Sequence, residues 1–189
     1  MLDQILQYDK ELFLYLNNWG SEYWDNLWLA ITYLYSSTPL YAALLFLIYK
    51  KFGWKALLLI VVIFAGVIAF TDQITNIFKD AFQRPRPCAA EGIIDLTRFV
   101  APRCGNYGFF SGHASNSMST AIFAGLLLRP YYKNLIYFLL IWSLVVAYSR
   151  IYVGVHYPLD ILCGLTFGAL SGFGFYKLCK YLIKRFISA

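Results

Sequence analysis

The sequence predicts an all-α integral membrane protein, a bundle of about six transmembrane helices preceded by an amphipathic N-terminal helix. Of its 189 residues, 60% are hydrophobic and only 14% are charged. Soluble domains carry about a quarter charged residues, so this composition indicates a lipid environment. The apolar residues form separate runs of helical length, and nothing marks a domain boundary. Residues 1–189 are therefore expected to form one membrane-embedded domain.

The N-terminal residues 1–18 form the amphipathic element. Leu2, Ile5, Leu12 and Leu16 recur at helical spacing, with polar residues such as Lys10 on the other side. This pattern favours a helix lying in the membrane surface. An ordinary packed helix at the edge of the domain is the alternative reading.

Six apolar segments follow, over residues 25–37, 39–50, 55–79, 113–128, 134–150 and 157–183. Several are shorter than the ~20 residues that cross the hydrocarbon of a bilayer. The chain contains 16 Tyr and 5 Trp, which can extend such segments into an interfacial aromatic belt. Pro39 separates the first two segments, because proline favours the start of a helix and disfavours its interior.

The net charge of +6 does not indicate a nucleic-acid partner, because the basic residues form short clusters between apolar runs. Ten of the 16 basic residues are expected opposite the long polar loop 80–112: Lys10, Lys50, Lys51, Lys55, Arg129, Lys133, Lys177, Lys180, Lys184 and Arg185. The positive-inside rule places those ten in the cytoplasm and the loop outside. Both termini are then expected to be cytoplasmic.

Three polar clusters interrupt the apolar pattern near the predicted helix ends. They contain Lys79, Arg84 and Arg86; Ser111, Gly112 and His113; and Arg150, His156 and Asp160. Antiparallel helices joined by short loops bring all three clusters to one membrane face. Ionisable residues at such depth are candidates for a functional site.

The chemistry of these residues suits a phosphate group. Lys79, Arg86 and Arg150 supply cationic donors, and guanidinium groups can hold phosphate oxygens in bidentate fashion. Ser111 and the Gly112 amide add donors at a predicted helix N-terminus, where the dipole favours an anion.

His156 and Asp160 lie four residues apart on a predicted helix, so they face each other across one turn. The aspartate can hold one imidazole nitrogen as N–H and leave the other free to attack. His113 is the only other histidine, and it can act as general acid.

The combined spacing resembles that of the type 2 phosphatidic acid phosphatase superfamily. The sequence has Lys79, six residues and Arg86-Pro87; then Ser111-Gly112-His113; then Ser149-Arg150, five residues, His156, three residues and Asp160. The resemblance covers about residues 55–175. One position departs from the family pattern, since Phe110 replaces the usual proline before Ser111. We expect this change to alter the shape of the loop and to leave activity intact.

The resemblance implies a metal-independent phosphatase without a cofactor. His156 would form a phosphohistidine that water hydrolyses, Asp160 would orient it, and His113 would be the general acid. The phosphoryl group would be bound by Lys79, Arg86, Ser111, Gly112 and Arg150. The substrate would be a lipid phosphate or diphosphate of a bacterial envelope: undecaprenyl diphosphate, lipid A phosphate, phosphatidylglycerophosphate or phosphatidic acid. The site would then face the periplasm from the inner membrane.

Several residues have two readings. Arg84 and Arg103 are candidates for contacts to a second phosphate or an anionic headgroup, or else are solvated loop charges. Asp72 either tunes Lys79 or forms a structural ion pair. Cys88 and Cys104 enclose the polar loop, where a disulfide is possible in an oxidising compartment.

Two other function classes have features in common with this sequence. A vanadate-binding haloperoxidase shares the motif set, but its members are soluble, which the apolar content opposes. A small membrane transporter or scaffold needs polar residues throughout the bilayer depth, whereas here they gather at one face. Membrane lipids are the expected surroundings, and the oligomeric state is not determined by the sequence.

Overall fold

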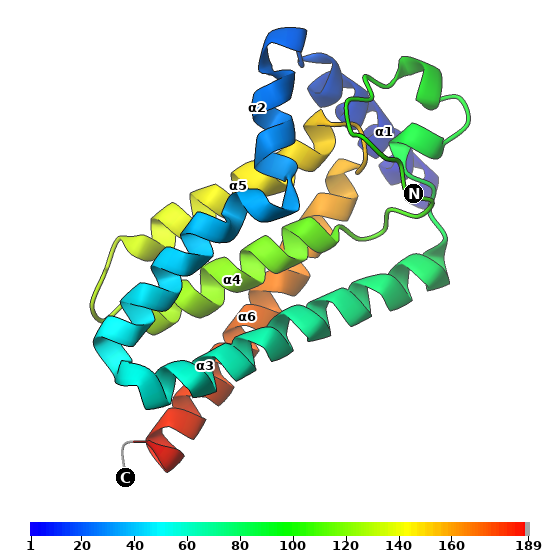
Figure 1. Cartoon of the computed structure of the whole chain (residues 1–189). Coiled ribbons are helices and arrows are strands. Elements are labelled where there is room, and N and C mark those ends of the chain that lie inside the picture. The colour runs from blue at the N-terminus through cyan, green and yellow to red at the C-terminus, as the bar shows by residue number, and fades with distance from the viewer. Residues whose placement is uncertain (188–189) are drawn as a thin grey trace.

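A computed structural model describes residues 1–187, in which every regular element is a helix, with one isolated bridge between Pro85 and Tyr107. The expectation of a single domain also covers residues 188–189, which lie outside the described residues. In chain order the elements are α1 (Leu2–Asn18), α2 (Glu22–Thr32), η1 (Leu34–Ser37), α3 (Thr38–Phe82), η2 (Pro87–Ala89), η3 (Ile94–Leu96), α4 (Gly112–Leu128), α5 (Leu135–Tyr152) and α6 (Pro158–Phe186). Figure 1 shows α3, α4, α5 and α6 running side by side as a bundle.

Helix α3 consists of two arms that fold back on each other. Gly53 interrupts the helix with φ 75° and ψ 176°, a conformation that glycine adopts at no steric cost. The arms match the separate apolar segments predicted over 39–50 and 55–79. In Figure 1 the first arm runs down to the turn and the second returns toward the opposite end.

Helix α4 lies at the centre of the bundle, in contact with α3, α5 and α6. Small residues fill its surface, including Ala114, Ser115 and Ala121, which are all buried. Small side chains allow membrane helices to approach closely. Because α4 carries His113 in its first turn, its tight packing fixes the position of that residue relative to α6.

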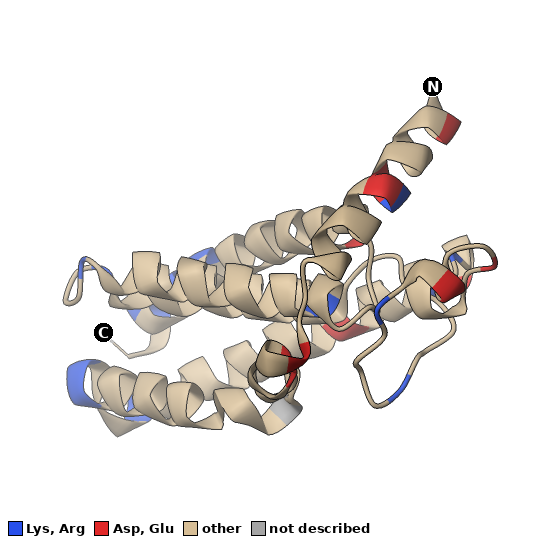
Figure 2. Ribbon diagram, turned by 90° about the horizontal axis from the view of Figure 1, so that it is seen from above, with Lys and Arg blue, Asp and Glu red and all other residues tan. Residues whose placement is uncertain are grey.

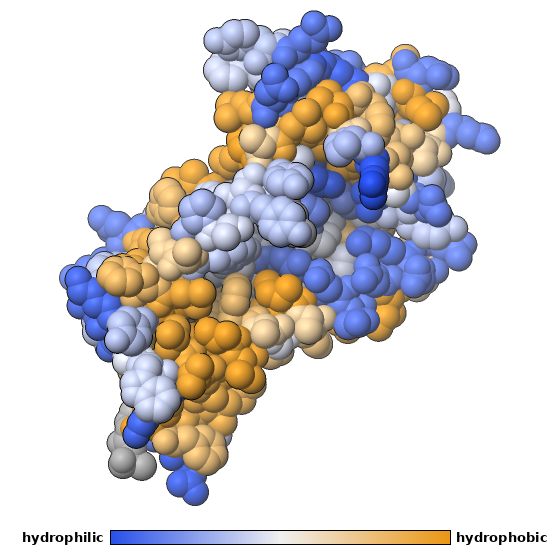
Figure 3. Space-filling model, in the orientation of Figure 1, coloured by the Kyte–Doolittle hydropathy of each residue, from blue (hydrophilic) through white to orange (hydrophobic). Residues whose placement is uncertain are grey.

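The chain is a membrane protein. Within residues 1–187, three helical stretches are long and apolar enough to cross a bilayer: Tyr35–Phe82, Leu135–Tyr152 and Pro158–Phe186. Figure 3 shows apolar surface around α3, with hydrophilic residues gathered over the loop between α3 and α4. The segment predicted over 25–37 corresponds to α2, which has 11 residues. A helix needs ~20 residues to cross the hydrocarbon of a bilayer, so α2 is too short to span it. It lies against α5.

Helix α1 and the N-terminus lie at the loop end of the bundle, whereas α6 ends at the opposite end (Figures 1 and 2). The side chains of Asp9 and Asn17 confirm this placement, since they bond to residues at the start of α6 and the end of α5. The expectation that both termini share one face is therefore wrong, and Lys10 also lies at the loop end. The error came from counting 25–37 as a full crossing.

Candidate active site

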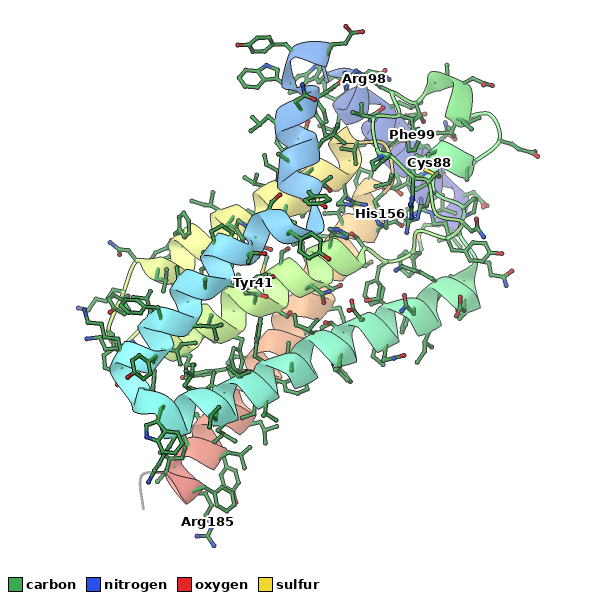
Figure 4. The ribbon with its side chains drawn as sticks, in the orientation of Figure 1. Tyr41, Cys88, Arg98, Phe99, His156 and Arg185 are labelled. Atoms are coloured by element: carbon green, nitrogen blue, oxygen red, sulfur yellow. A yellow bond between two sulfur atoms is a disulfide. The ribbon has the colours of Figure 1, made fainter. Side chains whose placement is uncertain are left out.

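The three polar clusters meet at the loop end of the bundle. The second arm of α3 ends there, α4 begins there, and the short turn between α5 and α6 closes the same end. Figure 4 places His156 in this turn, below the loop that carries Cys88. The structure therefore brings together the predicted residues from α3, the 83–111 loop, α4, α5 and α6.

His156 and Asp160 form a buried pair at the start of α6. The Nδ1 atom of His156 lies 3.3 Å from Oδ2 of Asp160, which also accepts the backbone N–H of Tyr157 at 3.0 Å. His156 is 2% exposed and Asp160 is fully buried. Burial lowers the pKa of His156 to about 4, against the opposing effect of Asp160, and Arg86 and Arg150 lower it further. The imidazole is therefore neutral near pH 7, as a nucleophile requires.

Arg86 reaches the site from the loop. Its Nε donates to the carbonyl oxygen of Tyr107 at 3.0 Å, which leaves the terminal nitrogens of the guanidinium free for another acceptor. A Cβ atom on Gly105 would lie 3.1 Å from the guanidinium carbon, so glycine at 105 provides room for Arg86. Burial lowers the pKa of Arg86. Arginine remains charged in proteins despite such a shift, so Arg86 stays a cationic donor.

Arg150 lies at the end of α5 and is held by α2. Its NH1 atom hydrogen-bonds to the hydroxyl of Thr32, the last residue of α2. Its Nε is buried without a hydrogen-bond partner in the described structure. Buried donors are normally satisfied, so this one is available to an acceptor that enters the site.

The start of α4 brings a backbone donor and a cation together. A Cβ atom on Gly112 would lie 3.9 Å from Nζ of Lys79, so glycine leaves space between the helix terminus and the ammonium group. The Ser111 side chain accepts from the Ala114 N–H at 3.4 Å and caps the helix. Its backbone N–H donates to the carbonyl oxygen of Asp160 at 3.0 Å, which joins α4 to α6.

Arg84 and Arg103 differ in their surroundings. Arg84 binds Oδ1 of Asp160 at 2.8 Å and Oδ2 of Asp9 at 2.5 Å, so both of its arms are occupied by carboxylates. This arrangement opposes the interpretation of Arg84 as a headgroup contact. Arg103 is exposed on the loop, and its contact to an anionic headgroup remains a proposal.

Asp72 hydrogen-bonds to Asn116 at 2.8 Å. No ion pair joins Asp72 to Lys79 among the described residues, but both groups lie close to Gly112, so an electrostatic effect of Asp72 on Lys79 stays a prediction.

The loop over the site is anchored at two places. Cys88 and Cys104 form a disulfide, which the sequence left undecided. At the other anchor, Asn17 of α1 bonds to Arg98 and to the end of α5, and Arg98 binds Asp25 of α2 at 2.5 Å. The sequence did not predict the hydrogen bonds made by Asn17, Asp25 and Thr32, because their partners lie more than 70 residues away. The position of Asn17 on the buried face of its helix is the feature of the sequence that could have indicated such a contact.

Two connected cavities lead from the site into the bundle. The first, of about 280 Å³, is lined by His113, Asn116 and Thr32. The second, of about 500 Å³, is almost wholly apolar and lies between the arms of α3 and α4. Tyr41, Phe64, Ile68 and Asp72 line both. Figure 4 shows Tyr41 on the first arm of α3, between the loop end and the Gly53 turn.

The fold and the site define a membrane-embedded enzyme that handles phosphate esters. The family model of the PAP2 superfamily matches residues 56–184, so the chain belongs to that superfamily and is a phosphatase.

The chain is also similar to individual proteins over most of its length. A lipid A 4'-phosphatase of Bacteroides thetaiotaomicron is 36% identical over 188 residues, which cover 98% of this chain and 83% of the relative. A lipid A 4'-phosphatase of Porphyromonas gingivalis is 34% identical over 192 residues, covering 100% and 80%. The crystal structure of a PAP2-type phosphatidylglycerolphosphate phosphatase from Bacillus subtilis is 20% identical, with a TM-score of 0.73 over 97% of this chain and 89% of that one. This last likeness supports the fold.

Proposed function

We propose that the protein removes a phosphate group from a lipid, with the 4'-phosphate of lipid A as the preferred substrate, through a phosphohistidine on His156. The observation that carries the proposal is the buried His156–Asp160 hydrogen bond beside the guanidinium group of Arg150, whose Nε has no hydrogen-bond partner among the described residues. The choice of lipid A follows from similarity to the two lipid A 4'-phosphatases, each matched along nearly the whole chain. Undecaprenyl diphosphate and phosphatidylglycerophosphate are the alternative substrates.

The first chemical step transfers the phosphoryl group to the enzyme. Asp160 holds Nδ1 of His156 as N–H, so the lone pair of Nε2 attacks phosphorus. The bond from phosphorus to the lipid oxygen breaks, and His113, which takes up a proton when the anionic phosphate binds beside it, donates that proton to this oxygen. In the second step water attacks phosphorus, gives its proton to His113 and releases phosphate from His156.

The cations would hold the phosphoryl oxygens throughout. Arg86 and Arg150 lie beside His156, Lys79 lies on the side of His113, and the Nε of Arg150 supplies a donor that is already buried. The Gly112 amide and Ser111 complete the set at the α4 terminus. Such prearranged donors act mainly by stabilising the charge that develops in the transition state.

The apolar cavity between the arms of α3 would take a hydrocarbon chain of the lipid. It adjoins the cavity at His113, so the phosphate can reach the site while its chain stays in an apolar environment. A transporter reading is less favoured, because charged residues gather at the two ends of the bundle and leave its middle almost free of charge (Figure 2).

The remaining basic residues of the group expected in the cytoplasm lie around the Gly53 turn, the α4–α5 turn and the end of α6. The positive-inside rule assigns that end to the cytoplasm. The site, the disulfide-anchored loop and the N-terminal helix would then face the periplasm from the inner membrane.

The test uses purified wild-type protein and the His156→Asn variant in detergent, with lipid A phosphorylated at both positions and excess EDTA. Mass spectrometry identifies which phosphate is lost. We expect wild type to release the 4'-phosphate and the variant to release none. Undecaprenyl diphosphate is assayed in parallel, and if only this lipid lost phosphate it would replace lipid A as the proposed substrate. Equal turnover by the variant would remove His156 as nucleophile.

A further inference from the structure

Asp9 is a buried carboxylate on the outermost helix of the fold. It is 4% exposed, although α1 lies at the edge of the bundle. Its Oδ1 accepts the backbone N–H of Leu159, in the first turn of α6, at 2.8 Å, and its Oδ2 binds Arg84. Buried charges require partners of this kind, since an isolated charge is costly to remove from water. Both partners of Asp9 lie next to the catalytic pair.

Arg84 connects Asp9 to Asp160. One guanidinium nitrogen binds each carboxylate, so the three side chains form a continuous chain from α1 to α6. The Arg84 guanidinium also lies over the ring of Tyr157, 4.3 Å from its centroid, and Phe13 of α1 packs edge-on against the same ring at 5.3 Å. Helix α1 thus fixes Arg84 from two sides.

The two carboxylate oxygens of Asp160 have different partners. Oδ2 faces His156, and Oδ1 faces Arg84. Alone, Arg84 would neutralise Asp160 and weaken its effect on the imidazole. Asp9 adds a second negative charge, so the three-residue group keeps a net charge of −1 beside His156.

We propose that Asp9 is a positioning residue for the phosphatase reaction, which through Arg84 sets the orientation and charge of Asp160 at the His156 nucleophile. This inference rests on the proposed role of His156. It makes the N-terminal helix part of the active-site framework, and it explains why Arg84 is engaged with carboxylates rather than with solvent.

The charge of this group matters because His156 is otherwise surrounded by cations. Asp160 on α6, Arg86 from the loop and Arg150 on α5 act on His156 directly. Arg84 from the loop and Asp9 on α1 act through Asp160, and Lys79 on α3 acts on His113 of α4, which itself faces His156. Removing one negative charge lowers the basicity of the imidazole. A less basic imidazole is a weaker nucleophile.

The test compares the pH dependence of kcat for four full-length proteins with the same lipid substrate: wild type, Asp9→Asn, Arg84→Gln and the double variant. For Asp9→Asn we expect kcat near pH 7 to fall about tenfold and KM to change less. The acid limb of the pH profile should move to lower pH by less than about one unit, because burial raises the pKa of Asp9 and wild type loses part of this charge in acid. Arg84→Gln leaves two carboxylates and should move the limb to higher pH. The double variant restores the net charge of −1, so its limb should return toward the wild-type position.

Asp25→Asn is the matched control. It also breaks an ion pair between an N-terminal helix and a loop arginine, but Asp25 has no contact with Asp160. Its acid limb should coincide with that of wild type, whatever its stability. Because the same substrate is used throughout, ionisation of the lipid phosphate cancels in the comparison.

Opposite shifts for the two single variants cannot arise from a purely structural role, which would leave the limb in place. The inference is overturned if wild type turns over lipid phosphate and Asp9→Asn, Arg84→Gln and the double variant all share its acid limb. If wild type shows no turnover, the proposed function fails instead, and the two failures are thereby distinguished.

Discussion

Gly168 of α6 lies so close to Ser115 of α4 that a methyl group on Gly168 would stand 2.3 Å from the Ser115 carbonyl oxygen. Gly164 and Gly172 repeat this relationship one turn away on each side, against the carbonyl oxygens of Ser111 and Ser119 at 2.6 Å. Four-residue spacing of glycine lets two membrane helices approach to backbone contact. Since α4 carries His113 and α6 begins directly after His156, this contact helps to set the distance between the proposed general acid and the proposed nucleophile.

Gly168→Ala should therefore destabilise the protein. The added methyl group clashes with backbone, which cannot move as a flexible side chain would, and overpacking of this kind costs about 1–3 kcal/mol. We expect a lower midpoint in thermal unfolding of the detergent-solubilised protein, together with reduced phosphatase activity.

Gly174→Ala on the same helix is the matched control. A Cβ atom at that position meets nothing within 4 Å. Alanine there should be neutral, or stabilising by up to ~1 kcal/mol through its better helix propensity. Equal unfolding midpoints for the two variants would show that the close α4–α6 contact does not limit the stability of the protein.

The local part of the site could be predicted from sequence because the residues are only a few positions apart. His156 lies two residues before α6 begins, so the two are not on one helix as predicted, yet their four-residue separation still brings them into contact. Lys79 and Gly112 end and begin consecutive helices, which puts them at one end of the bundle. For such residues the chain itself determines the neighbourhood.

The long-range part could not be predicted, because nothing in the pattern pairs distant charges. Asp9 and Arg84 are 75 residues apart, and Asp9 is one of several acidic residues in α1. The position of α1 depended on whether residues 25–37 cross the membrane, and hydrophobicity alone misjudged that length. The glycine spacing of α6, in contrast, was visible in the sequence and indicates the closest helix contact.

The disulfide between Cys88 and Cys104 should stabilise the loop that carries Arg86. Closing a loop of about 15 residues removes roughly 3 kcal/mol of conformational freedom from the unfolded chain. We expect Cys88→Ser/Cys104→Ser to unfold at lower temperature and to raise KM more than it lowers kcat, because the folded site persists but its loop is less well held.

Thiol counting in denaturant checks the bond directly. Cys163 and Cys179 are free, so two thiols should be alkylated without reductant and four with it. Cys163→Ser serves as the control for the loss of a cysteine outside the loop. Four reactive thiols in protein that was never reduced would contradict the bridge.

Arg150→Lys should lower kcat although it keeps the charge. Lysine cannot both reach the Thr32 hydroxyl and present the buried donor that Nε supplies, because it lacks the planar fork of the guanidinium. Loss of one transition-state donor costs about 2.7–4 kcal/mol, or roughly 100- to 1000-fold in rate. Steady-state kinetics on the lipid substrate measures this effect. Arg129→Lys, at the far end of the bundle, should behave as wild type.

The neutrality of His156 makes a pH prediction with a definite sign. Its pKa is lowered from 6.5 to about 4 because the imidazole is buried. The neutral form therefore persists as pH falls through 6.5, and nucleophilic activity should decline only as pH falls through about 4. The folded state takes up this proton later than the unfolded state does, so stability from neutral His156 is complete above 6.5 and is lost between 6.5 and 4.

Nuclear magnetic resonance can follow this titration directly, because the chain contains only two histidines. The His113→Asn variant leaves one imidazole signal, that of His156. We expect its midpoint near 4, with circular dichroism at each pH to establish that the protein is still folded. A midpoint near 6.5 in folded protein would mean that His156 is solvated and positively charged in mild acid, and the buried nucleophile described here would have to be abandoned.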